Sequence, residues 1–505
     1  MLLKVKALHL LAGRPIAILH EEIARYLNLH VGERIKIKRY GKKKEIVAPV
    51  DLTGGKTILN KDEIALSQEI FKNLKLRSKE IIEISPALKP LSVSFIHKKL
   101  DGQTLTFTEI YSIISDIVNN ELTEAEVAFF VSSVYLQGMN FDEIASMTKA
   151  MVKTGYQLKF DKPITIDKHS IGGVEGNRTT PLVVSIIASA IDQLKLKAVM
   201  PKTSSRAITS AAGTADVIET LAKIDFSINE IKDIVKKTNA CLVWGGSLGL
   251  APADDKIIQI ERILSLDPEA QLLASILSKK LSVNASHVLI DISYGKGAKM
   301  SNRSEAEKLK HKFEKIAKKL NLNIIVALTD GTQPVGNGIG TILEMKDVLA
   351  ILKQDKDRPI DLENRALYLS TKLLSFVTGM SEKQAYIVTK GILISGEAYK
   401  KFEQIIEAQR GSLRNIENKL RLGKFKQDMK AKQSGILKEI SNKKMARIAR
   451  LAGSPADKSA GIYLNKHIGD KVKKKETLFT IYAETLAKLH YAQKVAERVM
   501  PMVVG

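Results

Sequence analysis

The chain has 505 residues, with 44% hydrophobic and 27% charged residues, which predicts a folded protein with a large core and excludes a disordered one. The formal net charge of +24 predicts attraction to anions such as nucleotides, phosphate or RNA. A single cysteine, Cys241, excludes an internal disulfide and a multi-cysteine zinc site. No apolar run reaches transmembrane length and no convincing leader is present, so we expect a cytoplasmic protein.

Residues 1–84 have the pattern of a β-rich N-terminal module. Strands are expected over residues 2–11 and 34–46, with a short helix over residues 20–27 between them. The segment 85–90 contains two prolines and is expected to be a linker.

A helical block with regular start signals follows this linker. At three places an N-cap residue stands three positions before a glutamate, and each pair precedes an apolar stripe at helical spacing. The pairs are Thr106/Glu109, Thr123/Glu126 and Asn140/Glu143. Three amphipathic helices with short connections predict a small all-α bundle, in which the stripes form the core.

From Lys162 onward, strand-like runs alternate with helix-like runs. The strands are expected over residues 164–166, 197–200, 240–244, 287–292 and 323–328. The helices are expected over residues 181–196, 215–224, 228–238 and 305–320, the last with a capping box at Ser304/Glu307. This alternation predicts a mainly parallel sheet covered by helices. Ligands of such sheets bind beyond the carboxyl ends of the strands, so the chemistry is expected in the loops there.

The loop after the first of these strands has the features of an anion site. Lys168-His169-Ser170 is followed by Gly172-Gly173 and then by an apolar, helix-like run. Glycines let the backbone approach an anion, and a helix N-terminus offers free N–H groups. The glycine spacing matches neither a Walker P-loop nor a dinucleotide fingerprint, and a plain connecting loop is the alternative reading.

The loop after Met200 is a second candidate anion site. The segment KTSSRAITSAAGTAD, residues 202–216, holds two cations and several hydroxyls ahead of another helix-like run. Glycine-containing loops also follow the three later strands, over residues 245–255, 293–299 and 329–338. Polar loops after consecutive strands predict one extended ligand site.

Two further segments are ambiguous in the sequence. Helix-like sequence returns at residues 257–283 and contains Asp267, which either caps a helix starting at Pro268 or has a chemical role. Residues 412–444 are rich in Lys and Arg but poor in aromatic residues, which favours a solvated linker or helix over an RNA site. The segment 461–484 looks like a lipoyl-type barrel-sandwich hairpin without a persuasive carrier lysine.

Taken in order, the motifs resemble the thymidine and pyrimidine-nucleoside phosphorylase family from about Leu91 to the C-terminus. The resemblance rests on Lys168-His169-Ser170 with Gly172-Gly173 and on the phrases LTEAEVAFFVSSVYLQGMNFDEIASMTKAM, SLGLAPADD, LLASILSKKL and LTDGTQPVGNGIG. It implies an α/β multidomain fold in which a two-segment all-α domain faces a mainly parallel-sheet α/β domain. The implied domains are 1–84 (β-rich module), 85–160 plus 252–283 (all-α), 161–251 plus 284–430 (α/β, phosphate-binding) and 431–505 (barrel-sandwich-like).

The chain departs from the nucleoside enzymes in its extra N-terminal module and in its second loop. Both features resemble the archaeal AMP phosphorylases within this family, which implies a pentosyltransferase that converts AMP and phosphate to adenine and ribose 1,5-bisphosphate, with CMP and UMP as further substrates. Such an enzyme must hold two phosphate groups, whereas a nucleoside enzyme holds one. A pyrimidine-nucleoside phosphorylase, an anthranilate-type phosphoribosyltransferase and an RNA-binding protein are the alternatives.

The resemblance also implies roles for individual residues. Asp267 falls at the position of the proton donor to the leaving base. The attacking phosphate is expected at Lys168, Ser170, Gly172 and Gly173. AMP is expected at Gly176, Ser205, Arg206, Ala207, Ile208, Thr209, Ser210, Thr214, Ser275 and Lys299. Lys279 matches a base-contacting position of the pyrimidine enzymes. No metal, cofactor, nucleic acid or membrane is expected, inorganic phosphate is a co-substrate, and a homodimer or larger homo-oligomer is expected.

Overall fold

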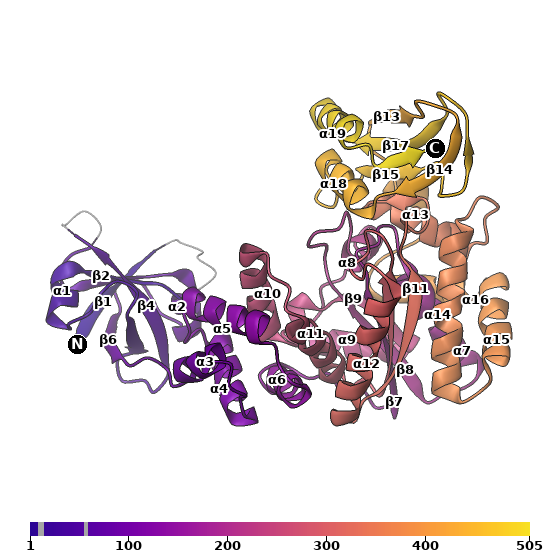
Figure 1. Cartoon of the computed structure of the whole chain (residues 1–505). Coiled ribbons are helices and arrows are strands. Elements are labelled where there is room, and N and C mark those ends of the chain that lie inside the picture. Colours follow the sequence, from indigo (N-terminus) through magenta and orange to yellow (C-terminus); the bar gives the residue numbers. More distant parts are fainter. Residues whose placement is uncertain (9–14, 55–58) are drawn as a thin grey trace. The chain divides into compact units, whose positions relative to one another are not determined.

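A computed structural model describes residues 1–8, 15–54 and 59–505 (Figure 1). The chain forms two compact units, Met1–Gly155 with Ala251–Ser278, and Tyr156–Leu250 with Lys279–Gly505. Within these units lie a helical bundle, a parallel-sheet α/β domain and a strand-rich C-terminal part, which confirms the predicted fold class. The four predicted domain boundaries stay predictions. Among the described residues, no helix is long and apolar enough to cross a membrane.

The N-terminal module is a closed barrel with the strand order β1-β5-β2-β4-β3-β6. Its elements are β1 (Leu2–Ala7), β2 (Ala17–His20), α1 (Glu21–Tyr26), β3 (Arg34–Arg39), β4 (Glu45–Thr53), β5 (Glu63–Leu66), α2 (Gln68–Leu74) and β6 (Ile81–Ala87). Alternating burial along β1 sends Leu3 and Val5 into the barrel core. The strand predicted over residues 34–46 is instead the separate strands β3 and β4, and residues 9–11 of the first predicted strand lie outside the described part. The predicted linker is also wrong at its start, because β6 pairs with β3 as far as Ala87.

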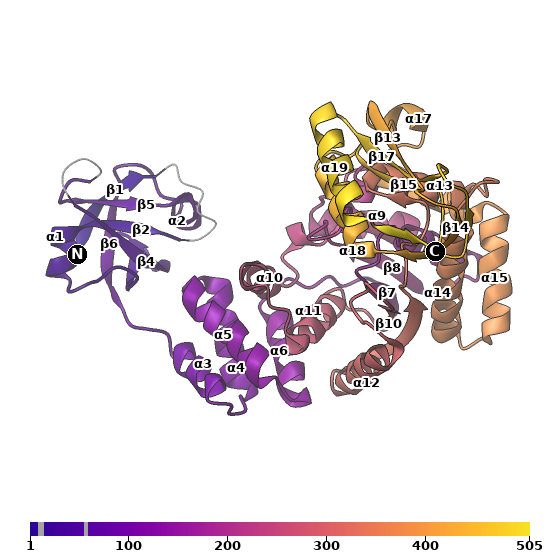
Figure 2. The same ribbon diagram turned by 45° about the horizontal axis from the view of Figure 1, so that its top comes forward.

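The helical bundle confirms the start signals read from the sequence. Its helices are α3 (Ser92–Leu100), α4 (Phe107–Asn119), α5 (Glu124–Gln137), α6 (Phe141–Lys153), α10 (Pro252–Leu264) and α11 (Glu269–Ser282) (Figure 2). All three predicted capping boxes are formed at the starts of α4, α5 and α6. The segment that returns after the first strands packs α10 against α4 and α5, which completes the apolar core of the bundle.

The α/β domain is built on a five-stranded parallel sheet with the order β11-β10-β7-β8-β9. The strands are β7 (Ile164–Ile171), β8 (Ala198–Ser204), β9 (Ala240–Trp244), β10 (His287–Tyr294) and β11 (Asn323–Asp330). The helices are α7 (Thr179–Gln193), α8 (Thr214–Ile218), α9 (Ile228–Thr238), α12 (Arg303–Lys319), α13 (Thr341–Leu352), α14 (Ile360–Thr378), α15 (Glu382–Ile394) and α16 (Glu397–Ala408). The helix α7 packs against β8 and β9 and is itself surrounded by α14, α15 and α16. The predicted cap of α12 is wrong, because Asn302 accepts from the N–H of Glu305 instead.

The C-terminal part contains two small sheets, β12-β15-β17-β13 and β16-β14-β18. Its elements are β12 (Gly338–Ile339), β13 (Phe425–Lys430), β14 (Gly435–Ile440), α18 (Asn442–Ala452), β15 (Gly461–Leu464), β16 (Lys471–Val472), β17 (Thr477–Ala483), α19 (Leu486–Val499) and β18 (Met502–Val504). The basic segment predicted as linker or helix therefore contains two strands. In β13 exposed lysines alternate with half-buried Phe425 and Met429, a period of two that the high charge obscures.

Candidate functional site

Lys168 lies near the carboxyl end of β7, the central strand of the sheet, and is 1% exposed. Its Nζ lies 2.5 Å from Ser170 Oγ, 2.8 Å from Thr179 Oγ1 and 3.9 Å from Asp291 Oδ2. The Ser170 hydroxyl donates to the same carboxylate oxygen at 2.8 Å. These groups meet because β7 and β10 are parallel neighbours whose register places Ser170 beside Asp291.

Asp291 is the counterion that the sequence reading missed. It is fully buried, and its second carboxylate oxygen accepts from Thr329 Oγ1 of β11 at 2.7 Å. A signal was present in the sequence, since Asp291 is the one acidic residue in an otherwise apolar strand-like run. Thr179 and Thr329 carried no comparable signal, because isolated threonines are common at strand ends and helix starts.

Burial lowers the pKa of Lys168 to about 8, although Asp291 opposes the shift. The side chain is therefore charged at neutral pH and loses its proton in mildly alkaline solution. A buried ammonium group with two hydroxyls around it is a donor set that suits a phosphate oxygen.

A second charged cluster lies in β7 next to this site. Asp167 is fully buried, with Lys280 Nζ 2.7 Å from one carboxylate oxygen and Lys202 Nζ 3.5 Å from the other. Burial alone would raise the pKa of Asp167, but the two ammonium groups hold it below its usual value. Burial and the same lysines lower the pKa of His169 well below its usual range, so the ring is neutral at pH 7.

The glycines of the first loop allow close backbone contacts. Gly173 and Gly176 have φ angles of 72° and 68°, in the left-handed region that favours glycine. A Cβ at Gly176 would lie 2.4 Å from the carbonyl oxygen of Val335, so no other residue fits there. The carbonyl of Gly172 accepts from the backbone N–H of Lys299 at 2.9 Å. The loop after β7 is thus packed against the loops after β10 and β11.

The second loop lies between β8 and α8, and its cation, Arg206, already forms ion pairs with carboxylates. Arg206 donates from Nη1 and Nη2 to Glu219 at 2.9 and 2.6 Å and from Nη1 to Asp216 at 3.1 Å. The hydrogen bonds from Arg206 lower the pKa of Glu219 to about 2. The guanidinium carbon also lies 5.1 Å from the centre of the Trp244 ring. Arg206 is among the residues expected to bind AMP, and in the structure both of its terminal nitrogens already donate to carboxylates.

Asp216 also occupies backbone donors of this loop. Its Oδ2 accepts from the N–H groups of Ala207 and Gly213 at 2.7 and 2.9 Å. The predicted loop residues on either side are exposed, at Ser205, Ile208 and Thr209. The start of α8 is therefore held by a carboxylate of the chain itself, and the exposed part of the loop is the part that a ligand can reach.

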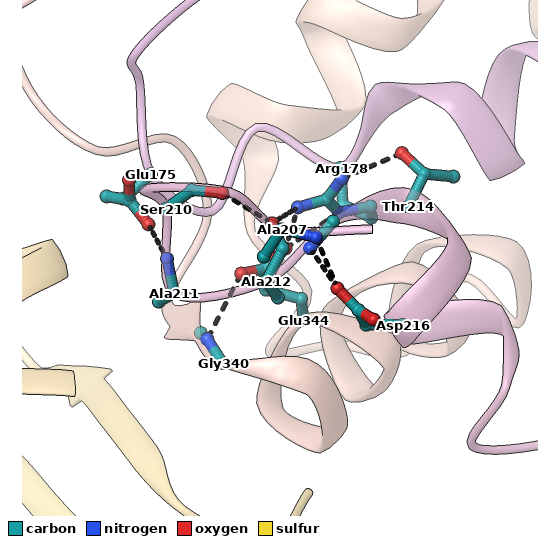
Figure 3. A network of polar contacts seen from close by, with 12 residues as sticks. Glu175, Arg178, Ala207, Ser210, Ala211, Ala212, Thr214, Asp216, Gly340 and Glu344 are labelled. Atoms are coloured by element: carbon teal, nitrogen blue, oxygen red, sulfur yellow. Dashed lines mark hydrogen bonds and ion pairs between the residues drawn. The ribbon is translucent and has the colours of Figure 1, made fainter. Parts of the chain in front are cut away.

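Figure 3 shows that Arg178 and Glu175 connect the two loops. Arg178, which follows the glycines, donates to Thr214 Oγ1 at 2.7 Å, to the carbonyl of Ala212 at 2.9 Å and to Glu344 of α13 at 2.7 Å. Glu175 accepts from the N–H of Ala211 at 3.0 Å, and burial raises its pKa to about 7. Neither residue was among the predicted site residues, since each acts on another loop and not on a recognisable motif.

The remaining predicted residues fall in both units. Asp267 is exposed and lies two residues before α11 begins. Ser275 is half-buried on α11 in the first unit, whereas exposed Lys299 follows β10 in the second. Lys279 is half-buried on α11. Within the described residues, no group of three or more His, Cys, Asp or Glu side chains is placed to hold a metal ion.

Three family models match the chain. A glycosyl transferase family helical bundle domain matches residues 93–155, the a/b domain of the same family matches residues 162–399, and a pyrimidine nucleoside phosphorylase C-terminal domain matches residues 436–502. Among solved structures, anthranilate phosphoribosyltransferase from Thermus thermophilus aligns with a TM-score of 0.52 at 15% identity, over 63% of this chain and 99% of that one. At that identity the alignment shows a shared fold alone.

Curated relatives match over nearly the whole length. The AMP phosphorylase of Thermococcus sibiricus is 42% identical over 99% of this chain and 97% of its own. The AMP phosphorylase of Methanocaldococcus jannaschii is 43% identical over 89% of this chain and 88% of its own. The AMP phosphorylase of Thermococcus kodakarensis is 41% identical over 99% of this chain and 97% of its own.

Proposed function

The chain belongs to the AMP phosphorylases, and we propose that it cleaves AMP with inorganic phosphate to give adenine and ribose 1,5-bisphosphate. CMP and UMP are further substrates of the same reaction. The observation that carries this proposal is the pair of polar loops at the carboxyl ends of β7 and β8, joined by Glu175 and Arg178. Two loops give the enzyme separate places for the attacking phosphate and for the 5′-phosphate of the nucleotide.

The first loop holds the attacking phosphate. Lys168 supplies the charge, Ser170 supplies a hydroxyl, and Gly172 and Gly173 let the backbone come close to the phosphate oxygens. Asp291 keeps the ammonium and the Ser170 hydroxyl in place before phosphate arrives. A phosphate oxygen then attacks C1′ of the ribose as the bond from C1′ to the base nitrogen breaks.

The second loop holds the nucleotide near its 5′-phosphate. The proposed binding residues are Gly176, Ser205, Arg206, Ala207, Ile208, Thr209, Ser210 and Thr214, together with Ser275 and Lys299. Exposed Ser205 and Thr209 offer hydroxyl and backbone donors, which bind phosphate without a further positive charge. Arg206 contributes through a loop that its ion pairs already order.

Asp267 is the proposed general acid. The electron pair of the breaking C1′–N bond goes to the base, and a proton from the Asp267 carboxyl prevents the base from leaving as an anion. A positioned acid of this kind accelerates such a step by about 10²–10⁴-fold.

A pyrimidine-nucleoside phosphorylase is the second candidate, favoured by the match of residues 436–502 to the C-terminal domain of that enzyme class. The two candidates differ in what the second loop must bind, because a nucleoside has no 5′-phosphate. Incubation with phosphate and a panel of nucleosides and nucleotides separates them. Release of adenine and a sugar bisphosphate from AMP is expected, whereas cleavage of thymidine or uridine without cleavage of AMP overturns the proposal.

The assembly and surroundings belong to the same proposal. We infer a homodimer or larger homo-oligomer in the cytoplasm that needs no cofactor and binds no nucleic acid. Apolar side chains on α5 support assembly, since Phe129 and Leu136 are 58% and 72% exposed and lie seven residues apart on one helix face. Light scattering of the purified protein tests the oligomer, and a monomeric mass contradicts it.

A further inference from the structure

The helix α18 of the C-terminal part begins directly at the loops of the candidate site. Its first residue, Asn442, is fully buried. The side-chain oxygen of Asn442 accepts from the N–H of Glu175 at 3.1 Å, and its amide nitrogen donates to the carbonyl of Gly331 at 3.1 Å. One side chain therefore ties the glycine loop after β7 to the loop after β11.

The chain that follows α18 contacts the second loop. The hydroxyl of Ser454, which is 3% exposed, donates to the carbonyl of Ala211 at 2.8 Å. Ala211 itself is fully buried in the apolar cluster of the C-terminal part. Further along, Lys458 Nζ lies 3.1 Å from the Glu219 carboxylate that pairs with Arg206.

These contacts place the two loops on two ends of one short segment. The backbone of Glu175 is bound at the start of α18 and that of Ala211 just beyond its end, and the Glu175 carboxylate accepts from the Ala211 N–H at 3.0 Å. A helix has a fixed rise per residue, so the segment fixes the separation of its two ends. Buried groups bound to these ends have no water to replace a lost partner.

We propose that α18 is a strut that sets the spacing between the two phosphate-binding loops, with Asn442 and Ser454 as its positioning residues. Asn442 positions the loop of the attacking phosphate, and Ser454 positions the loop of the nucleotide. Neither touches a substrate, and each acts through the backbone that it holds. The inference rests on the proposed function of the two loops.

The experiment measures KM for phosphate and KM for AMP separately in three variants of the full chain. Asn442→Ala is expected to raise KM for phosphate about tenfold or more and to change KM for AMP less than about threefold, since a small misplacement of a binding loop has effects of this size. Ser454→Ala is expected to raise KM for AMP about tenfold or more and to change KM for phosphate less than about threefold.

Thr485→Ala is the matched control. Thr485 caps α19 in the same part of the chain by accepting from the N–H of Lys488, and its described contacts reach neither loop. It is expected to lower the melting temperature and leave both KM values unchanged. If Asn442→Ala does not fold, Asn442→Asp replaces it, because the acid keeps the acceptor for Glu175 and loses the donor to Gly331.

Equal changes of both KM values in Asn442→Ala and Ser454→Ala, or no change in either, contradict the proposal that α18 sets the spacing between the two loops. A wild-type enzyme that releases no adenine from AMP instead overturns the proposed function, so the two failures are distinguishable.

Discussion

The two loops of the candidate site balance their charges in opposite ways. In the first, the buried ammonium group of Lys168 contacts the hydroxyls of Ser170 and Thr179, with the Asp291 carboxylate 3.9 Å away. In the second, Arg206 is 38% exposed on its side chain and is already bound by Glu219 and Asp216. A positive charge alone therefore does not identify the binding group, and the partners of each cation must be known.

The difference also separates two kinds of recognition. A buried cation that is already in position binds an anion strongly, because the site needs little rearrangement when the anion binds. A loop whose cation is already neutralised selects a ligand by its hydroxyls, backbone donors and shape. Four experiments test this difference between the two loops.

The largest effect on activity is expected from a change outside both loops. Asp267→Asn keeps the size of the side chain and removes the proton, so kcat is expected to fall by about 10²–10⁴-fold while AMP binding changes little. Steady-state kinetics with an equilibrium measurement of AMP binding checks this. Full activity of the variant would show that Asp267 is not the general acid.

Lys168→Ala removes the buried charge of the first loop. The value of kcat/KM for phosphate is expected to fall by about 10²–10³-fold, the cost of losing one strong donor in a preorganised site. The control is Lys424→Ala, which removes a lysine whose side chain is 78% exposed. A comparable loss in that control would point to net charge and not to the site.

Arg206→Ala tests the second loop. Its effect on AMP is expected to exceed its effect on adenosine by about 10- to 150-fold, because one charge-assisted contact to the 5′-phosphate, or the loop order that supports it, is worth roughly 1.5–3 kcal/mol. Arg206→Lys, which keeps the charge without the fork, is expected to fall between the two. Equal losses on both substrates refute the assignment of this loop to the 5′-phosphate.

The smallest effect is a pH dependence confined to the first loop. The pKa of Lys168 is lowered to about 8, so its ammonium is present below that pH and is lost above it. The value of kcat/KM for phosphate is expected to decline above about pH 8, and Lys168→Arg is expected to move the decline to higher pH. A profile that is identical in the two proteins shows that another group titrates.

Local sequence signals were sufficient for most elements of the fold. The capping boxes at Thr106, Thr123 and Asn140 depend on residues three apart, and the parallel strands depend on short apolar runs. Those signals fail where charge hides a period of two, as in β13, and where two caps compete, as at Asn302 and Ser304.

The candidate site was less predictable, because its contacts join distant parts of the chain. Ser170 and Asp291 are 121 residues apart and meet through strand register, and Glu175 and Asn442 are 267 residues apart. The carboxylate partners of Arg206 lie close to it in the sequence and could have been predicted. Asp216 and Glu219 are three residues apart, a spacing that places both carboxylates on one side of a helix.

The most direct test of two phosphate sites is a calorimetric titration of Asp267→Asn with inorganic phosphate in the presence of saturating AMP. The variant is chosen because its slow chemistry keeps AMP intact during the titration. We predict that one phosphate binds for each AMP-bound chain. Phosphate binding that AMP abolishes by competition would contradict it, since the two ligands would then share a single site.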